Sequence, residues 1–249
     1  MPKPSTLSPL PIMKTRLQWI RDAGVPVATV LDAGVQYGTP FLQECFPNAR
    51  HLLFEPLDQY FSSIEKSYSQ FQWELFPVAL SDTDGQSWQF GFSVDESGKV
   101  QSSRLSDQPA SPGEEPNLVS CRAVQRVRLD SIIGNRKEAQ PFLLKVDVDG
   151  HEMPVLRGAK GTLDQCSIVI VEAITQTIGE KISLMSIAGF NLIDIVDLCY
   201  YHQNLSQVDL IFVHKQWVQQ CTALRPWQTQ VFTWDKWAPL SRNELFSGL

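Results

Sequence analysis

The chain has 249 residues, 43% of them hydrophobic, with a formal net charge of −6 and a pI near 5.2. This size and composition suit one α/β domain with short additions. The acidic balance and the absence of a Lys/Arg cluster argue against a nucleic-acid partner, because phosphate binding needs such a cluster.

The cysteines and the apolar runs indicate where the protein works. The five cysteines are widely spaced, odd in number and contain no CxxC pair, so neither a disulfide framework nor a zinc knuckle is indicated. The first residues, MPKPSTLSPLPIMK, lack the apolar core of a signal peptide, and no apolar run approaches the length of a membrane span. We therefore expect a soluble protein of the reducing cytoplasm.

The first predicted elements are a helix and a strand. Residues 12–23 place apolar side chains among Lys and Arg, which predicts a weak amphipathic helix within an N-terminal segment over residues 1–26. Residues 27–31 are apolar and predict a short strand that ends at Asp32. After a turn, residues 39–46 predict the next helix.

The turn after this strand predicts a ligand site. Gly34 and Gly38 let the backbone bend tightly and approach a ligand. A second strand over residues 49–54 ends at Glu55, 21 residues beyond Gly34, the interval at which an acid reaches ribose hydroxyls in nucleotide-binding βαβ units. The missing GxGxxG disfavours a nicotinamide cofactor. Each residue alone would suit an ordinary turn or a surface acid, but together they favour S-adenosylmethionine (SAM), with Asp32 facing its ammonium.

A helix over residues 57–68 and a third strand over residues 73–80 follow. That strand leads into Ser81 and Asp82 of a DTDG turn. Two interpretations stay open: the Asp side chains bond within the turn, or Asp82 accepts a hydrogen bond from an adenine amino group.

Two alternating segments, residues 87–94 and 123–129, predict partly exposed strands that can pair. Between them, residues 95–118 are rich in proline, serine and acids. This composition predicts a flexible excursion that could act as a lid. A short helix is expected over residues 129–133.

The most informative stretch is residues 143–159, LLKVDVDGHEMPVLRGA. Its apolar start predicts a central parallel strand, and Lys145 and Asp147 point the same way because their spacing is two. Ligands gather at the carboxyl ends of strands in open α/β sheets, so Asp147, Asp149 and His151 are expected at that rim. The aspartates could instead merely cap the following helix, with Lys145 neutralising them. Burying so many ionisable groups without a task is costly, which favours a site.

The last predicted strands complete the sheet. Residues 168–171 predict a buried strand that ends at Glu172, which stands beside Asp147 if the two strands are neighbours. The remaining elements are a helix over residues 178–188 and two antiparallel strands over residues 191–196 and 208–213, joined by a polar loop over residues 198–207.

The segment over residues 216–249 is rich in aromatic side chains. It carries Trp217, Trp227, Phe232, Trp234, Trp237 and Phe246. Such a tail is expected to pack on its own domain or on a twin subunit in a homodimer, and it could also wall an apolar acceptor pocket.

Several motifs in order resemble the FkbM family of SAM-dependent methyltransferases. They are VLDAGVQYG at 30–38, FEP at 54–56, VALSDTDG at 78–85, VRLDSII at 127–133, LLKVDVDGHEMPVLRGA at 143–159 and IVIVEA at 168–173. The resemblance covers roughly residues 27–214 and implies a methyltransferase domain over residues 27–215. The family turn usually reads D-x-G-A-N-x-G; here Val35 and Gln36 stand in the Ala-Asn places, and Gln36 can still donate an amide hydrogen bond.

The resemblance implies the fold and the reaction. The fold class is α/β, a Rossmann-like class I methyltransferase with a mostly parallel seven-stranded sheet, a C-terminal antiparallel hairpin and helices on both faces. The reaction is O-methylation of a hydroxyl on a sugar, polyketide or other secondary metabolite. A non-catalytic SAM-fold subunit and, less favoured, a nicotinamide oxidoreductase are the alternatives.

The site residues follow from these motifs. Those expected to bind the cofactor are Asp32, Gly34, Gln36, Gly38, Glu55, Ser81 and Asp82. We expect direct displacement, with Asp147, His151 or Glu172 as the base or orienting group and Lys145 as an electrostatic partner. Asp147 and Glu172 could instead share a divalent metal ion that lowers the pKa of the acceptor hydroxyl.

Overall fold

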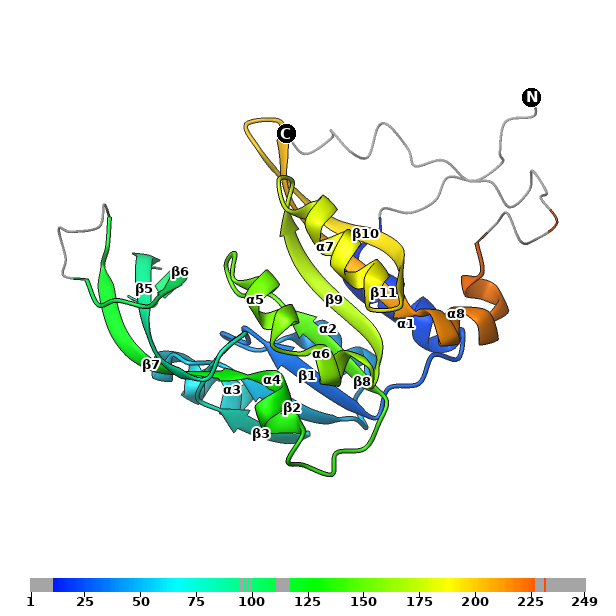
Figure 1. Cartoon of the computed structure of the whole chain (residues 1–249), viewed down its shortest axis with the longest axis horizontal. Coiled ribbons are helices and arrows are strands. Elements are labelled where there is room, and N and C mark those ends of the chain that lie inside the picture. Colours follow the sequence, from blue (N-terminus) through cyan, green and yellow to red (C-terminus); the bar gives the residue numbers. More distant parts are fainter. Residues whose placement is uncertain are drawn as a thin grey trace.

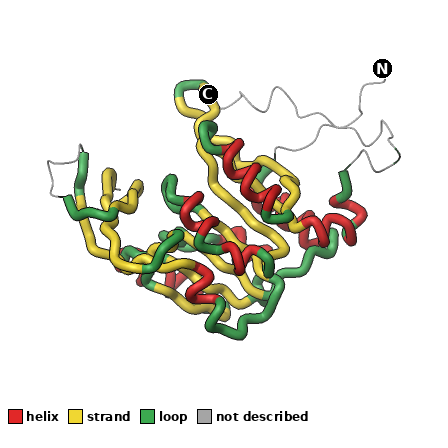
Figure 2. Tube along the Cα trace, in the orientation of Figure 1, coloured by secondary structure: helices red, strands yellow, loops and turns green. Residues whose placement is uncertain are grey.

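The structure of the protein is a computed structural model, which describes residues 11–94, 96, 98, 100–110, 117–226 and 231. Its body is a seven-stranded sheet with helices on both faces, and a four-stranded sheet stands beside it (Figures 1 and 2). No helix in the described part of the chain combines the length and apolar character needed to cross a membrane.

The main sheet has the order β3-β2-β1-β8-β9-β11-β10. Its strands are β1 Thr29–Ala33, β2 Arg50–Phe54, β3 Gln72–Phe76, β8 Phe142–Val146, β9 Cys166–Ile174, β10 Phe190–Tyr201 and β11 Asn204–His214. β11 is antiparallel to both of its neighbours, while β1, β2, β3, β8 and β9 pair in parallel. This confirms the predicted mostly parallel sheet with a C-terminal antiparallel hairpin. The predicted polar loop over residues 198–207 is wrong in extent, because β10 and β11 pair through most of it.

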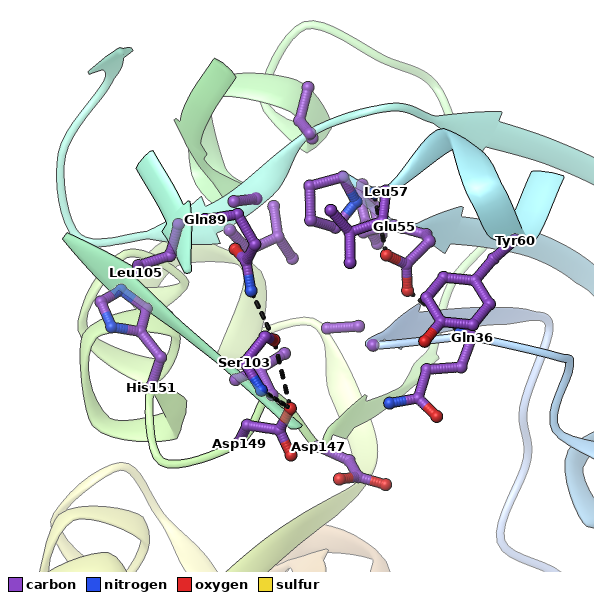
Figure 3. A pocket seen from close by; sticks show the side chains of 18 of the residues that line it. Gln36, Glu55, Leu57, Tyr60, Gln89, Ser103, Leu105, Asp147, Asp149 and His151 are labelled. Atoms are coloured by element: carbon purple, nitrogen blue, oxygen red, sulfur yellow. Dashed lines mark hydrogen bonds between the residues drawn. The ribbon is translucent and has the colours of Figure 1, made fainter. Parts of the chain in front are cut away.

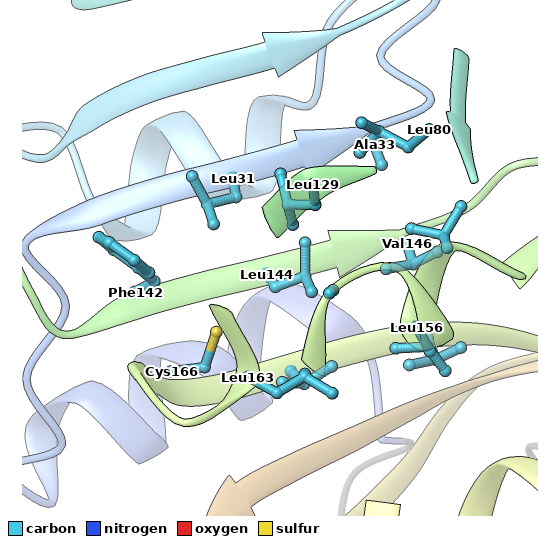
Figure 4. Close-up of a cluster of buried hydrophobic side chains, with 14 of the residues drawn as sticks. Leu31, Ala33, Leu80, Leu129, Phe142, Leu144, Val146, Leu156, Leu163 and Cys166 are labelled. Carbon is cyan, nitrogen blue, oxygen red and sulfur yellow. The ribbon is translucent and has the colours of Figure 1, made fainter. Parts of the chain in front are cut away.

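Helices cover both faces of this sheet. One face carries α1 Met13–Asp22, α2 Pro40–Cys45, α3 Phe61–Tyr68 and α8 Lys215–Gln220, and the other carries α4 Leu129–Ile133, α5 Glu152–Arg157, α6 Lys160–Leu163 and α7 Ile178–Ile187. Successive strand residues point to opposite faces. Leu144 of β8 therefore packs with Leu156 of α5 (Figure 4), whereas Leu143 packs with Leu17 of α1. Burying each such side chain contributes about 1.5–3 kcal/mol.

The second sheet has the order β4-β7-β5-β6. Its strands are β4 Ala79–Ser81, β5 Gly85–Val94, β6 Val100–Ser106 and β7 Ser120–Arg128. β5 and β7 are antiparallel, which confirms the predicted pairing of residues 87–94 with residues 123–129. The predicted third strand, residues 73–80, is instead divided: β3 lies in the main sheet and β4 in the second one.

The predicted flexible excursion over residues 95–118 contains β6. Its backbone pairs with β5, and Val100 is buried against Leu57 and Tyr60. The expectation of a segment without packed structure is therefore wrong for residues 100–106. Within the excursion, residues 95, 97, 99 and 111–116 lie outside the described residues.

The aromatic tail is described only in part. Trp217 of α8 packs against the buried residues around α1, and a 3₁₀ helix, η2 Thr222–Leu224, follows. Its other aromatic side chains, Trp227, Phe232, Trp234, Trp237 and Phe246, lie outside the described residues. A subunit contact through this tail stays a prediction.

Candidate active site

The carboxyl ends of the central strands lie at one edge of the main sheet. β8 and β9 pair in parallel with Val146 opposite Val171, so Asp147 and Glu172 follow at the same level. The predicted adjacency of these two strands is confirmed. Parallel strands therefore bring these two carboxyl groups to the sheet edge where ligands gather in open α/β folds.

Two cavities adjoin at this edge. The first encloses about 610 Å³, open solvent included, and Leu57, Tyr60 and Leu80 form part of its wall (Figure 3). The second is polar and encloses about 860 Å³ on the same measure. Gly34, Gln36, Asp147 and Asp149 line both cavities. Mostly apolar walls with a few polar groups are typical of small-molecule sites.

Glu55 supplies the buried carboxylate of the first cavity. It is 3% exposed. One oxygen accepts the backbone N–H of Gln36 at 3.0 Å, and the other accepts the N–H of Leu57 at 3.0 Å. A carboxylate has about four acceptor positions, so about two remain for a ligand. Burial raises the pKa of Glu55 to about 7, against the lowering effect of the two hydrogen bonds.

The turn after β1 requires glycine because it packs closely on its neighbours. Gly34 has φ +83°, and a Cβ there would lie 1.8 Å from the carbonyl oxygen of Asp147. Gly38 has φ +113°, and its Cβ would lie 2.5 Å from Ser67 Oγ. Side chains rarely adopt such φ values. Gly34 thus brings the turn against the end of β8, where both cavities meet, and Gly38 brings it against α3.

Asp32 is fully buried behind this turn. Its Oδ2 accepts hydrogen bonds from Thr39 Oγ1 at 2.6 Å and from the Tyr68 hydroxyl at 3.3 Å. Lys145 Nζ lies 3.4 Å from Asp32 Oδ1 and 3.2 Å from Asp147 Oδ2. Burial alone would lower the pKa of Lys145, but Asp147 and Asp32 together raise it above its usual value. Asp32 lines neither cavity, so its contact with a ligand ammonium stays a prediction.

The second cavity is acidic. Among the described residues, Asp147, Asp149 and Glu172 line it with a single cation, Lys145. Gln207 Nε2 donates a hydrogen bond to Glu172 Oε1. Burial, and next the charge of Asp147, raises the pKa of Glu172 to about 8. This wall therefore favours neutral or cationic ligand groups.

His151 belongs to the first cavity. Its Nε2 lies 2.9 Å from the buried hydroxyl of Ser81, and it does not line the second cavity. Burial lowers the pKa of His151, and the charge of Asp82 partly opposes this. Asp82 Oδ2 lies 3.5 Å from Arg157 Nε, and neither Ser81 nor Asp82 lines either of these two cavities. The structure thus brings Asp147 together with Glu172, while His151 turns toward β4.

Several site residues were not predicted. The backbone N–H and the hydroxyl of Ser103 on β6 donate to Asp149 Oδ2 at 3.0 and 3.2 Å (Figure 3). Gln89 of β5 donates in turn to Ser103 Oγ. These contacts join residues far apart in sequence, so no local pattern identifies them. The second sheet therefore forms one wall of the first cavity.

The predicted metal site was compared with the described side chains. They contain no group of three or more His, Cys, Asp or Glu that could hold a metal ion. Asp147 and Glu172 alone would supply too few protein ligands for a closed zinc or calcium site. We therefore derive no step through a metal.

One of the comparisons with known proteins identifies a family. A family model described as the methyltransferase FkbM domain matches residues 22–192. No curated protein matches the chain.

Several solved structures are similar to the chain at low identity. Magnesium protoporphyrin IX methyltransferase from Synechocystis PCC 6803, with bound SAM, has 10% identity over 81% of this chain and 77% of that one, with a TM-score of 0.44. The ribosomal protein L11 methylase of Lactobacillus delbrueckii subsp. bulgaricus has 12% identity over 84% of each chain and a TM-score of 0.44. A putative RNA methyltransferase from Pyrococcus horikoshii has 9% identity over 81% of each chain and a TM-score of 0.43.

Proposed function

The chain belongs to the FkbM methyltransferase family and is a SAM-dependent methyltransferase, and we propose that it methylates a hydroxyl group of a small molecule such as a sugar or polyketide. The observation that carries the proposal is the pair of cavities that meet at Asp147. One has an apolar wall with a buried carboxylate, and the other is acidic. A nucleoside and a hydroxylated acceptor could occupy them side by side.

The first cavity suits the adenosine half of SAM. Leu57, Tyr60 and Leu80 offer apolar contact to a base, and Glu55 keeps about two acceptor positions for ribose hydroxyls. The turn from Gly34 to Gly38 lines the second cavity and would face the methionine half. When bound, SAM supplies a methyl group activated by its positively charged sulfur. Asp147, which lines both cavities, would stabilise that charge.

In the second cavity, Glu172 is the group we assign as the base. Its raised pKa, about 8, makes it a stronger proton acceptor than an ordinary carboxylate and places its pKa near neutral pH. The acceptor hydroxyl would pass its proton to a Glu172 oxygen as its own oxygen attacks the methyl carbon. Gln207 holds the carboxylate in one orientation through Oε1, and most of the rate gain would come from positioning.

The charges also narrow the acceptor class. Three carboxyl groups and one lysine line the second cavity, and that lysine is already paired with Asp32 and Asp147. An acceptor with a phosphate or carboxylate near the reacting hydroxyl would be repelled. We therefore propose a neutral or amine-bearing acceptor.

The proposal is tested by incubating the purified protein with SAM carrying a labelled methyl group and with metabolite extracts or defined sugars and polyketides. We expect a mass gain of one methyl group, on oxygen, in a neutral or cationic compound. Binding of SAM or its demethylated product, S-adenosylhomocysteine, without any transfer would instead identify a non-catalytic binding subunit. Methylation of a nitrogen or carbon atom would contradict the assigned acceptor group.

A further inference from the structure

Behind the second cavity lies a buried ion pair that no step above uses. Lys181 of α7 and Glu152 of α5 are 2% and 3% exposed, and Lys181 Nζ lies 2.9 Å from Glu152 Oε2. Neither side chain lines either cavity. A buried ion pair adds little net stability compared with apolar side chains of similar volume. We therefore ask which backbone segments this ion pair holds in place.

Glu152 holds the loop between β8 and α5. Its Oε1 accepts the backbone N–H of Gly150 at 2.8 Å and that of Val148 at 3.4 Å. In the same loop, Asp149 has φ +51° and Gly150 has φ +91°. A non-glycine residue in this region is strained and needs its surroundings to hold it there. Glu152 supplies that restraint to the backbone of the loop that carries Asp147 and Asp149, while Ser103 holds the Asp149 side chain.

Lys181 holds the end of β9. Its ammonium also donates to the carbonyl oxygen of Glu172 at 2.6 Å. One ion pair thus joins two separate segments, the loop after β8 and the end of β9. These segments supply Asp147, Asp149 and Glu172, the three carboxyl groups of the second cavity.

We propose that Lys181 and Glu152 are positioning residues for methyl transfer, which fix the loop carrying Asp147 and Asp149 relative to Glu172 without touching cofactor or acceptor. This inference rests on the proposed transferase function. A displacement of about 1 Å at a reacting group can lower a rate about 10²-fold. Loss of the pair should therefore slow transfer more than it weakens cofactor binding, because Glu55 is held by the N–H groups of Gln36 and Leu57, outside this loop.

The decisive variant removes both charges together. Glu152→Leu with Lys181→Met leaves no unpaired buried charge, but it removes the acceptor of the Val148 and Gly150 N–H groups, so the thermal midpoint should fall moderately. The matched control is Lys215→Met. Like Lys181, Lys215 donates to a backbone carbonyl oxygen, that of Ser186 in α7 at 3.0 Å, but Lys215 is exposed. A second variant, Glu152→Gln with Lys181→Met, keeps an acceptor for the Val148 and Gly150 N–H groups and loses the link to Glu172.

Three measurements test the pair. Calorimetry with S-adenosylhomocysteine should show a smaller change in Kd than in the rate of transfer for both double variants, and no change for Lys215→Met. Methyl transfer from labelled SAM is measured with a metabolite extract in which the wild type methylates a compound. The maximal rate of transfer should fall about 10²-fold in both double variants, while the extract dilution that gives half of this rate should change little. Hydrogen exchange over residues 147–152 should rise strongly in the Leu/Met variant, but much less in the Gln/Met variant.

The outcomes distinguish failure of the positioning role from failure of the proposed methyltransferase function. Two results would overturn the positioning role. One is hydrogen exchange over residues 147–152 that is unchanged in the Leu/Met variant. The other is a maximal rate of methyl transfer in the Gln/Met variant equal to that of Lys215→Met. If the Leu/Met variant does not fold, the rate of the Gln/Met variant decides. If wild type neither binds S-adenosylhomocysteine nor transfers methyl groups, the proposed function fails, and the exchange measurement still decides whether the pair holds the loop.

Discussion

Glu55 should make the ligand-free protein less stable as pH rises, and Glu55→Gln should remove that dependence. The folded-state pKa of Glu55 is about 7 because the carboxyl is buried, against an ordinary value of 4.5. A raised pKa means that the folded protein holds the proton more tightly than the unfolded chain does. The contribution of Glu55 to stability is thus fully present below about pH 4.5 and is lost as pH rises through about 7.

The size of the effect follows from these two values. By linkage, ionising Glu55 lowers the free energy of unfolding by about 1 kcal/mol at pH 5 and by about 3 kcal/mol at pH 8. The wild type should therefore lose about 2 kcal/mol between these pH values through Glu55 alone. Glu55→Gln also disturbs the hydrogen bonds from Gln36 and Leu57, but that cost is the same at both pH values and cancels in the difference.

Urea denaturation of the wild type and the variant at pH 5 and pH 8 measures this difference. The matched control is Glu74→Gln. Burial opposes the ionisation of Glu74, but hydrogen bonds from Arg136 and Arg50 lower its pKa below the usual value, so its titration lies below this pH window. If the free energy of unfolding changes between pH 5 and pH 8 by the same amount in wild type and Glu55→Gln, within about 0.5 kcal/mol, the assigned pKa of Glu55 and its cause are refuted. In the same variant, the affinity for S-adenosylhomocysteine should fall by about 1–3 kcal/mol.

Three further predictions concern the turn, the base and the metal. In urea denaturation, Gly34→Ala should destabilise the protein by about 3 kcal/mol or more, because the new Cβ would meet the Asp147 carbonyl at a positive φ. The control is Gly179→Ala, at an exposed position of α7 with open space around it. This change should stabilise the protein by up to about 1 kcal/mol. Glu172→Gln should lower kcat about 10²–10⁴-fold and abolish the rise of kcat near pH 8 that we expect ionisation of Glu172 to cause in the wild type. His151→Ala should act mainly on S-adenosylhomocysteine affinity, and the reverse pattern would make His151 the base. Dialysis against EDTA should leave turnover unchanged, since the described side chains form no set of three metal ligands; loss of turnover with recovery on adding Mg²⁺ would restore the shared ion at Asp147 and Glu172.

Much of the main sheet was predictable because its signals are local. Apolar runs that end in an acid identify β1, β2, β8 and β9, and parallel pairing then brings those acids to one edge. The same reasoning placed Glu172 beside Asp147, as the β8–β9 register confirms. Both depend only on chain order and on the pleat of the strand.

The directions of individual side chains could not be predicted in this way. His151 and Asp147 are four residues apart, yet His151 bonds to Ser81 of β4 while Asp147 lies with Glu172. Which side His151 takes depends on where β4 runs, and the sequence predicts β4 as part of one strand with β3. Composition is also a poor guide at residues 100–106, because the polar residues of a strand such as β6 can still pair along the edge of β5.

The placement of β6 changes how the first cavity is understood. The Tyr60 hydroxyl donates to the carbonyl oxygen of Val100, and Ser103 donates to Asp149. β6 is thus bonded both to the segment after β2, beside Glu55, and to the loop after β8. A ligand in the first cavity would touch the two sheets at once, since Gln89 of the second sheet lines it together with Glu55. Occupancy of this cavity should therefore stabilise the second sheet as well as the first, and the cofactor would act as a structural link between them.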